Sequence, residues 1–241
     1  MVFLFGIGLI IHYLGKPNLR LLWLMLVVAG GMLFKVSLSV QWVQELLRFH
    51  LPPVSNLHMF LLTLLVLVTT PLLGPLWCAH LCPFGALQEL ISRLGMTLGL
   101  TREPPQRVSR VFKGLRYLAL LVVVLSLYSS NPSSLDSVDP MSTTLASALF
   151  GTALVVSLLS MFGALFEFRF YCRNLCPVGA LLSVLGKLSL LFAFKPRRDY
   201  SACDLGVQGP WDTNCMQCNR CITELSRPSE ERPESSSSTG S

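Results

Sequence analysis

One ten-residue motif occurs twice in this chain and constrains its fold more than any other feature. Residues 78–87 read CAHLCPFGAL, and residues 172–181 read CRNLCPVGAL. The two cysteine pairs are offset by the same 94 residues, from Cys78 to Cys172 and from Cys82 to Cys176. A long apolar run precedes each motif. The pattern therefore predicts a duplicated helix–motif–helix unit.

The composition predicts a membrane protein. Of the 241 residues, 52% are hydrophobic and only 13% are charged, which is too apolar for a soluble domain of this size. The net charge of +6 comes from basic residues beside apolar runs, so the charge does not indicate a nucleic-acid partner. We predict an all-α integral membrane protein with about five transmembrane helices, at residues 2–14, 19–34, 54–77, 115–127 and 141–168.

The charges between these helices predict their orientation. If five helices alternate, the basic segments around Lys16 and Arg20, in residues 101–113 and after residue 168 lie on one side. The positive-inside rule makes that side cytoplasmic, and both cysteine motifs and the C-terminus lie there. Residues 101–113, rich in arginine and proline, are expected to form a loop, and residues 37–53 an amphipathic interfacial helix.

Composition divides the chain into three segments. Residues 1–198 are predicted to form a transmembrane domain that contains the two C-x3-C-P repeats. Residues 199–226 are expected to form a small, incomplete ferredoxin-like segment. Residues 227–241 are rich in serine, glutamate and proline without apolar anchors, so we expect a disordered tail.

The C-terminal cysteines follow the spacing of an iron–sulfur ligand set. Cys215, Cys218 and Cys221 form C-x2-C-x2-C, the first three quarters of a bacterial ferredoxin run. A complete run would have cysteine and proline where Leu225 and Ser226 stand, so Cys203 is the candidate fourth ligand. We expect a [4Fe-4S] cluster here; a zinc site or free thiols are the alternatives.

The repeated cysteines predict a second redox or metal centre. Residues four apart on a helix share one face. Two pairs meeting across the repeat would present four thiolates, the number that one cubane or one tetrahedral metal requires. The alternatives are apolar packing, and a disulfide within or between the pairs, which a reducing compartment disfavours. The ligands would be Cys78, Cys82, Cys172 and Cys176, and the sequence offers no catalytic triad or phosphate loop.

The doubled motif and the cysteine run that follows it resemble the membrane polyferredoxins of the NosR/NapH type. The matching stretches are residues 77–90 and 171–181, and the resemblance covers about residues 51–221. It implies a multi-pass protein of the bacterial inner membrane that carries [4Fe-4S] clusters. Such a protein relays electrons between the quinol pool and a periplasmic respiratory or cofactor-maturation system of the nitrous-oxide or nitrate reductase type. Quinol is then the implied substrate, with the chain acting as an electron-transfer component or quinol dehydrogenase subunit.

This chain departs from that family pattern in two ways. It has one incomplete ferredoxin run where the family usually has two complete runs, and it has no FMN-binding domain of the nitrous-oxide type. A further iron–sulfur or FMN-binding subunit is therefore an expected partner. The alternative function is a membrane metal-handling factor that passes a soft metal such as Cu(I) to a periplasmic enzyme. A third interpretation, based on Leu225, is a structural anchor with degenerate cluster sites.

Overall fold

The computed structural model describes ten helical elements and no strand in residues 2–14, 17–34, 38, 40–48, 57–100, 106–127, 152–187, 203, 207, 209, 215 and 218. The prediction of an all-α protein is confirmed for this part of the chain. The elements are α1 Val2–Leu14, α2 Pro17–Phe34, α3 Val40–Leu47, α4 Leu57–Leu73, η2 Trp77–Leu81, α5 Pro83–Thr97, α6 Gln106–Ser126, α8 Thr152–Phe166, α9 Phe170–Asn174 and α10 Pro177–Leu185.

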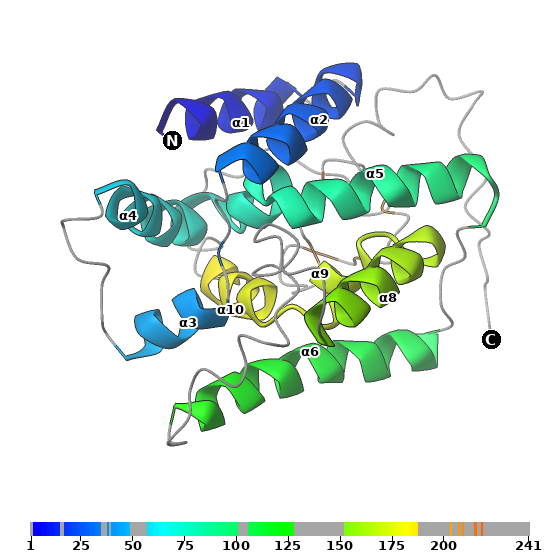
Figure 1. Ribbon diagram of the computed structural model, residues 1–241. Helices are drawn as coiled ribbons and strands as arrows, with labels where there is room; N and C mark the ends of the chain where they lie inside the picture. Colours follow the sequence, from blue (N-terminus) through cyan, green and yellow to red (C-terminus); the bar gives the residue numbers. More distant parts are fainter. Residues whose placement is uncertain are drawn as a thin grey trace.

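The helix α5 lies near the middle of the molecule. The helices α1 and α2 lie on one side of it and α6 on the other, with α8 between α5 and α6 (Figure 1). The helix α5 packs against both α2 and α8, and α10 packs against α6. At Gly95 of α5 a Cβ atom would overlap the backbone carbonyl of Leu165, so this glycine permits the close approach of α8.

The predicted duplication is visible in the order of the elements. A long helix, a single helical turn and a second helix follow one another as α4, η2 and α5, and again as α8, α9 and α10. The two turns carry the first cysteines of their motifs. The element order therefore reproduces the helix–motif–helix unit twice.

Two expectations about the helices are tested directly. The loop predicted at residues 101–113 is wrong in part, because α6 begins at Gln106. Arginine and lysine are good helix formers, and a helix can begin directly after the proline at position 105. The helix expected within residues 37–53 is confirmed as α3.

The five membrane spans stay a prediction. Across the ranges that the structure describes, we find no helix that combines the length and the apolar character needed to cross a membrane. Residues 128–151, which include the start of the fifth predicted span, lie outside the described residues, as do Cys221 and the tail at 227–241.

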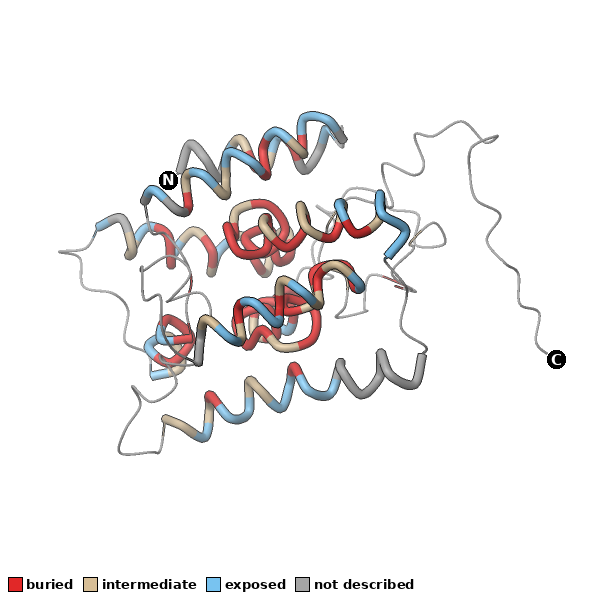
Figure 2. Tube along the Cα trace, turned by 45° about the vertical axis from the view of Figure 1, so that its right-hand side comes forward, coloured by how far each residue is buried: buried red, intermediate tan, exposed pale blue. Residues whose placement is uncertain are grey.

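Burial is highest where the two repeats meet. The turns η2 and α9 and the starts of α5 and α10 are buried almost throughout, whereas the long helices show exposed faces (Figure 2). The apolar core is centred on Trp77, Phe84 and Tyr171, with Trp42 and Val43 of α3 and Leu62 and Val66 of α4 packed around them. The cysteine motifs therefore lie in the core of the protein.

Candidate metal centre

The two cysteine motifs have nearly the same backbone geometry at their second cysteines. Cys82 has φ −71° and ψ 115°, and Cys176 has φ −70° and ψ 114°; each is the N-cap of the helix that follows. Pro83 and Pro177 occupy the first helical turns, where the missing N–H costs nothing and the fixed φ suits a helix. The peptide N–H of each second cysteine donates to the carbonyl five residues earlier, at 2.9 Å in both repeats.

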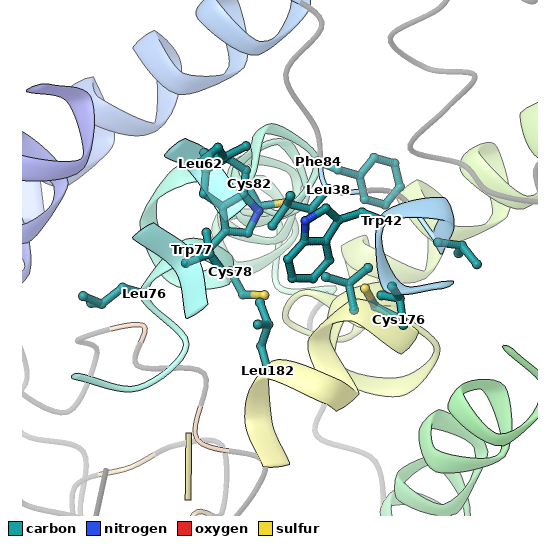
Figure 3. Packing of buried hydrophobic residues seen from close by; sticks show 14 of the residues in the cluster. Leu38, Trp42, Leu62, Leu76, Trp77, Cys78, Cys82, Phe84, Cys176 and Leu182 are labelled. Carbon is teal, nitrogen blue, oxygen red and sulfur yellow. The ribbon is translucent and has the colours of Figure 1, made fainter. Parts of the chain in front are cut away.

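Packing brings the two cysteine pairs into one buried region. The exposed fractions are 8% for Cys78, 4% for Cys82, 4% for Cys172 and 3% for Cys176. Figure 3 shows Cys78 and Cys82 of the first repeat and Cys176 of the second within one cluster of apolar side chains. The rings of Phe84 and Tyr171 join the repeats in an edge-to-face contact, with their centroids 5.4 Å apart. The two pairs therefore lie in one buried region, and their assignment to a single four-thiolate centre stays a prediction.

Electrostatic interactions link the four thiols. Burial raises the pKa of the Cys78 thiol well above its ordinary value, and Cys82 and Cys176 raise it further. Burial is also the main cause of the raised pKa of the Cys172 thiol, and Cys82 and Cys176 raise that pKa further. The guanidinium of Arg169 acts in the opposite direction on both thiols. Ionising these thiols therefore requires a metal or a positive charge to stabilise the thiolates.

The surroundings of the thiols fit an iron–sulfur cluster. The N–H of Gly179 donates to Sγ of Cys176 at 3.3 Å, the kind of amide–sulfur bond that tunes such clusters. A Cβ atom on Gly85 would lie 3.6 Å from Sγ of Cys172, an ordinary van der Waals distance, so this glycine lies directly beside the sulfur. The carboxamide oxygen of Gln88 accepts from the N–H of Cys172 at 3.4 Å, and its buried Nε2 donor has no partner among the described atoms. An additional sulfur acceptor would satisfy that donor.

The described residues do not preassemble a site for a single ion. Among them, no three histidine, cysteine, aspartate or glutamate side chains lie close enough together to hold one metal ion. No disulfide joins any of the seven described cysteines, so the disulfide alternative is not observed in this set. The fit to a cluster therefore rests on the donors, the glycines and the common burial of the thiols.

The C-terminal cysteines are only partly placed. Cys203, Cys215 and Cys218 are half-buried, whereas Cys221 lies outside the described residues. The assignment of these cysteines to one cluster with Cys203 as the fourth ligand therefore stays a prediction.

One C-terminal cysteine interacts with the repeat site. Burial would by itself lower the pKa of Arg169, but Glu89 and Cys172 raise it, and Cys218 adds to this effect. Cys218 therefore lies within electrostatic range of a residue that also interacts with the repeated cysteines.

A buried ion cluster beside the first motif was not predicted from the sequence. Glu89, with no exposed surface, accepts two bonds from Arg20, from Nε to Oε1 and from Nη2 to Oε2, both at 2.8 Å. Its carboxylate also lies 2.6 Å from Nη2 of Arg169 and 3.0 Å from Nη2 of Arg93. Burial alone would raise the pKa of Glu89, but Arg20 and Arg169 outweigh it and hold the pKa well below its usual range.

Sequence reasoning assigned Arg20 and Arg169 to basic segments that set the membrane orientation. Both are buried, with exposed fractions of 4% and 0%. A usable signal was present, because a glutamate follows the first motif closely in a chain with few charges, and buried charges in apolar proteins mark functional positions.

The second repeat has a different polar partner at the equivalent position. Ser183 lies 94 residues after Glu89 and is bonded by Nη2 of Arg116, which also donates to the carbonyl of Gly179 at 3.2 Å. Arginines of α2 and α6 therefore reach into equivalent places of the two repeats, but only the first repeat has a carboxylate there.

Comparison with known proteins gives matches in the same two regions. The family described as "4Fe-4S binding domain" matches residues 55–101 and 144–198, which contain one motif each. Protein NirI of Paracoccus denitrificans is 32% identical over 170 residues, which cover 63% of this chain and 25% of the relative. The putative electron transport protein YccM of Escherichia coli is 31% identical over 186 residues, covering 73% and 49%. The ferredoxin-type protein NapH of Haemophilus influenzae is 25% identical over 184 residues, covering 75% and 58%.

These matches span less than two thirds of the length of the relatives. No solved structure matches the chain significantly. The expected [4Fe-4S] cofactor is confirmed by the family match, whereas the ligand assignment of each cysteine is not tested by it.

Proposed function

Because two stretches of this chain match the 4Fe-4S binding domain family and the chain is similar to NosR, NapH, NirI and YccM, we propose that it is a membrane-bound iron–sulfur protein that relays electrons. It would connect the quinol pool with a periplasmic respiratory or cofactor-maturation system. Quinol would be the electron donor or acceptor on the membrane side. A further iron–sulfur or FMN-binding subunit would complete the electron path.

The observation that carries this proposal is the common burial of the four repeated cysteines. Cys78, Cys82, Cys172 and Cys176 come from two repeats with nearly superimposable backbone angles at their second cysteines. Four thiolates are the ligand number of a [4Fe-4S] cluster, and such a cluster supplies reversible one-electron transfer when it is bound. A second cluster would be held by Cys215, Cys218 and Cys221, with Cys203 as the fourth ligand.

The protein residues around the thiols have three tasks in this proposal. The peptide N–H of Gly179 donates to Cys176 and orients that sulfur. Gln88 fixes the peptide of Cys172 through its oxygen and directs an amide donor into the buried region. The apolar shell around Trp77 and Phe84 excludes water, which helps to set the reduction potential of a buried cluster.

The distribution of side chains supports placement in a membrane. Charged and polar groups are buried at the centre, including Arg20, Glu89 and Arg169, whereas large apolar side chains are exposed on the long helices. Soluble monomers rarely expose apolar surface of this extent. The exposed side chains include Leu22 and Leu26 of α2, Leu64 of α4, Leu121 of α6, and Leu158 and Phe162 of α8. A bacterial inner membrane would cover these faces, with the cysteine-rich side and the C-terminus in the cytoplasm.

The first test is the iron and labile-sulfide content, with EPR spectra, of protein purified without air. Cys78→Ser and Cys218→Ser are compared with the wild type, and Leu81→Ala serves as a control that changes the same segment without removing a thiol. We expect each serine variant to lose a different cluster signal and the control to keep both. Wild-type protein without iron and labile sulfide contradicts the proposal.

The same preparations test the alternative function. A tight Cu(I) complex of the wild type, together with an absence of iron, would favour a metal-handling factor whose paired cysteines pass a soft metal to a partner. Retention of the protein in membranes after an alkaline wash tests the proposed location separately, because an integral protein stays in the pellet.

A further inference from the structure

Arg169 has an unusual backbone conformation among the described residues. It has φ 53° and ψ 48°, and it is the only non-glycine residue among them with a positive φ. This left-handed conformation is unfavourable for a residue with a Cβ atom. Such a conformation persists when its surroundings fix it, and it is often found at functional positions.

The contacts of Arg169 connect the two repeats. Arg169 precedes α9 of the second repeat, but its side chain donates to the carbonyls of Cys78 at 2.7 Å and Ala79 at 3.0 Å in the first repeat. Its backbone N–H donates to Oγ of Ser92 in α5 at 3.2 Å, and Nη2 forms the ion pair with Glu89. The side chain has no exposed surface, and its Nε donor has no partner among the described atoms.

Arg169 also carries a positive charge into the cysteine region. Glu89 provides one negative charge against three guanidiniums, from Arg20, Arg93 and Arg169, so the ion cluster has a net charge of two positive units. Arg169 is the member of this cluster that bonds the peptide of Cys78. The equivalent position of the first repeat is Pro75, so the second repeat alone supplies this cation.

We propose that Arg169 is a positioning residue for the four-cysteine site and raises the reduction potential of the cluster bound there. The inference rests on the proposed function. Its guanidinium fixes the first motif against the second and places a permanent positive charge beside the thiolates. Reduction adds one electron to the bound cluster, and a nearby positive charge stabilises that added negative charge.

The test is a potentiometric titration with dithionite, monitored by EPR, of the full-length protein purified without air. Arg169→Met removes the charge, and we expect at least a tenfold shift of the equilibrium away from the reduced form, which is about 59 mV for a one-electron couple. Glu89→Gln removes a negative charge and shifts the potential upward. The double variant restores the net charge of two and returns the potential toward the wild-type value.

Two further variants separate charge from structure. Arg169→Lys keeps the charge but not the planar fork, so its potential stays near the wild-type value while less cluster is retained on purification. Arg93→Met changes a more exposed partner of the same carboxylate and shifts the potential least. If Arg169→Met does not fold, the opposite shifts of Glu89→Gln and the double variant decide the question.

The proposal is overturned if the wild type binds a cluster but Arg169→Met keeps its potential, or if Arg169→Met and Glu89→Gln shift it in the same direction. Equal losses in the methionine and lysine variants would assign Arg169 a purely structural role and also overturn it. A wild type that binds no cluster contradicts the proposed function itself, which distinguishes the two failures.

Discussion

The two repeats share the backbone conformation of the second cysteine but differ in the charges that surround their motifs. The second cysteines have nearly identical φ and ψ, and each leads into a helix that begins with proline. The first repeat then has Glu89 with three arginines, whereas the second has Ser183 with Arg116. Local sequence therefore sets the shape of each motif, and distant residues set its electrostatics.

Replacement of the second cysteine of either motif should have the largest effect on cluster content, and the effect should be alike in the two repeats. Cys82→Ala and Cys176→Ala each remove one of four candidate ligands from equivalent positions. We expect both variants to lose the same EPR signal and a similar amount of iron. A variant that keeps the full signal would show that the two repeats do not share one cluster.

Loss of the side chain that bonds the buried arginines should lower the stability of the protein far more in the first repeat than in the second. Glu89→Gln leaves buried guanidiniums without their counter-charge, which typically costs about 3–5 kcal/mol. Ser183→Ala removes a neutral partner of Arg116, which keeps the carbonyl of Gly179 as an acceptor, so the cost should be about 1 kcal/mol. Denaturant unfolding in detergent micelles measures both, and equal losses would contradict the contrast between the repeats.

The acid sensitivity of the protein should depend on the first repeat. The folded-state pKa of Glu89 is lowered, so its contribution to stability is complete above the pKa of a free glutamate, about 4.3, and is lost as the pH falls below that value. Unfolding curves between pH 7 and pH 3 should show a steeper loss for the wild type than for Glu89→Gln. A parallel pH dependence in the two proteins would show that Glu89 does not carry this effect.

Alanine substitutions at the motif glycines, Gly85 and Gly179, should show the smallest difference in stability between the repeats. A Cβ atom at Gly85 would meet its nearest neighbour, the carbonyl of Cys78, at 3.4 Å, whereas at Gly179 the carbonyl of Cys172 lies at 3.2 Å. Gly179→Ala should therefore cost about 1 kcal/mol and Gly85→Ala less. Gly30→Ala in α2 is the control, because nothing lies within 4 Å of its added Cβ atom and alanine favours a helix. Thermal unfolding compares the three.

Much of the architecture could be predicted from sequence patterns alone. The helix after the first motif, the amphipathic helix α3 and the duplication follow from proline positions, residue periodicity and the repeated motif, which act over a few residues. The start of α6 was misjudged because arginine and proline were taken as loop residues, although arginine is a good helix former.

For the candidate site, the sequence predicted candidate cysteine ligands, whose assignment stays a prediction, but not the residues around them. The cysteine spacing identified the thiols, and the family match confirms the cofactor class. The residues that surround the thiols were missed. Arg169 and Gln88 act on cysteines of the other repeat, and no short-range pattern indicates such a contact.

The sequence by itself determined that the chain is helical, apolar and duplicated, and that each motif turns at a cysteine–proline step, because those properties depend on neighbouring residues. The tertiary structure alone decided which charges are buried and which thiols lie in the same buried region. Glu89 bonds Arg20 and Arg169 at sequence separations of 69 and 80 residues. Their pairing depends on how α2, α5 and the turn before α9 pack, and packing places a charge beside another only after the whole fold has formed.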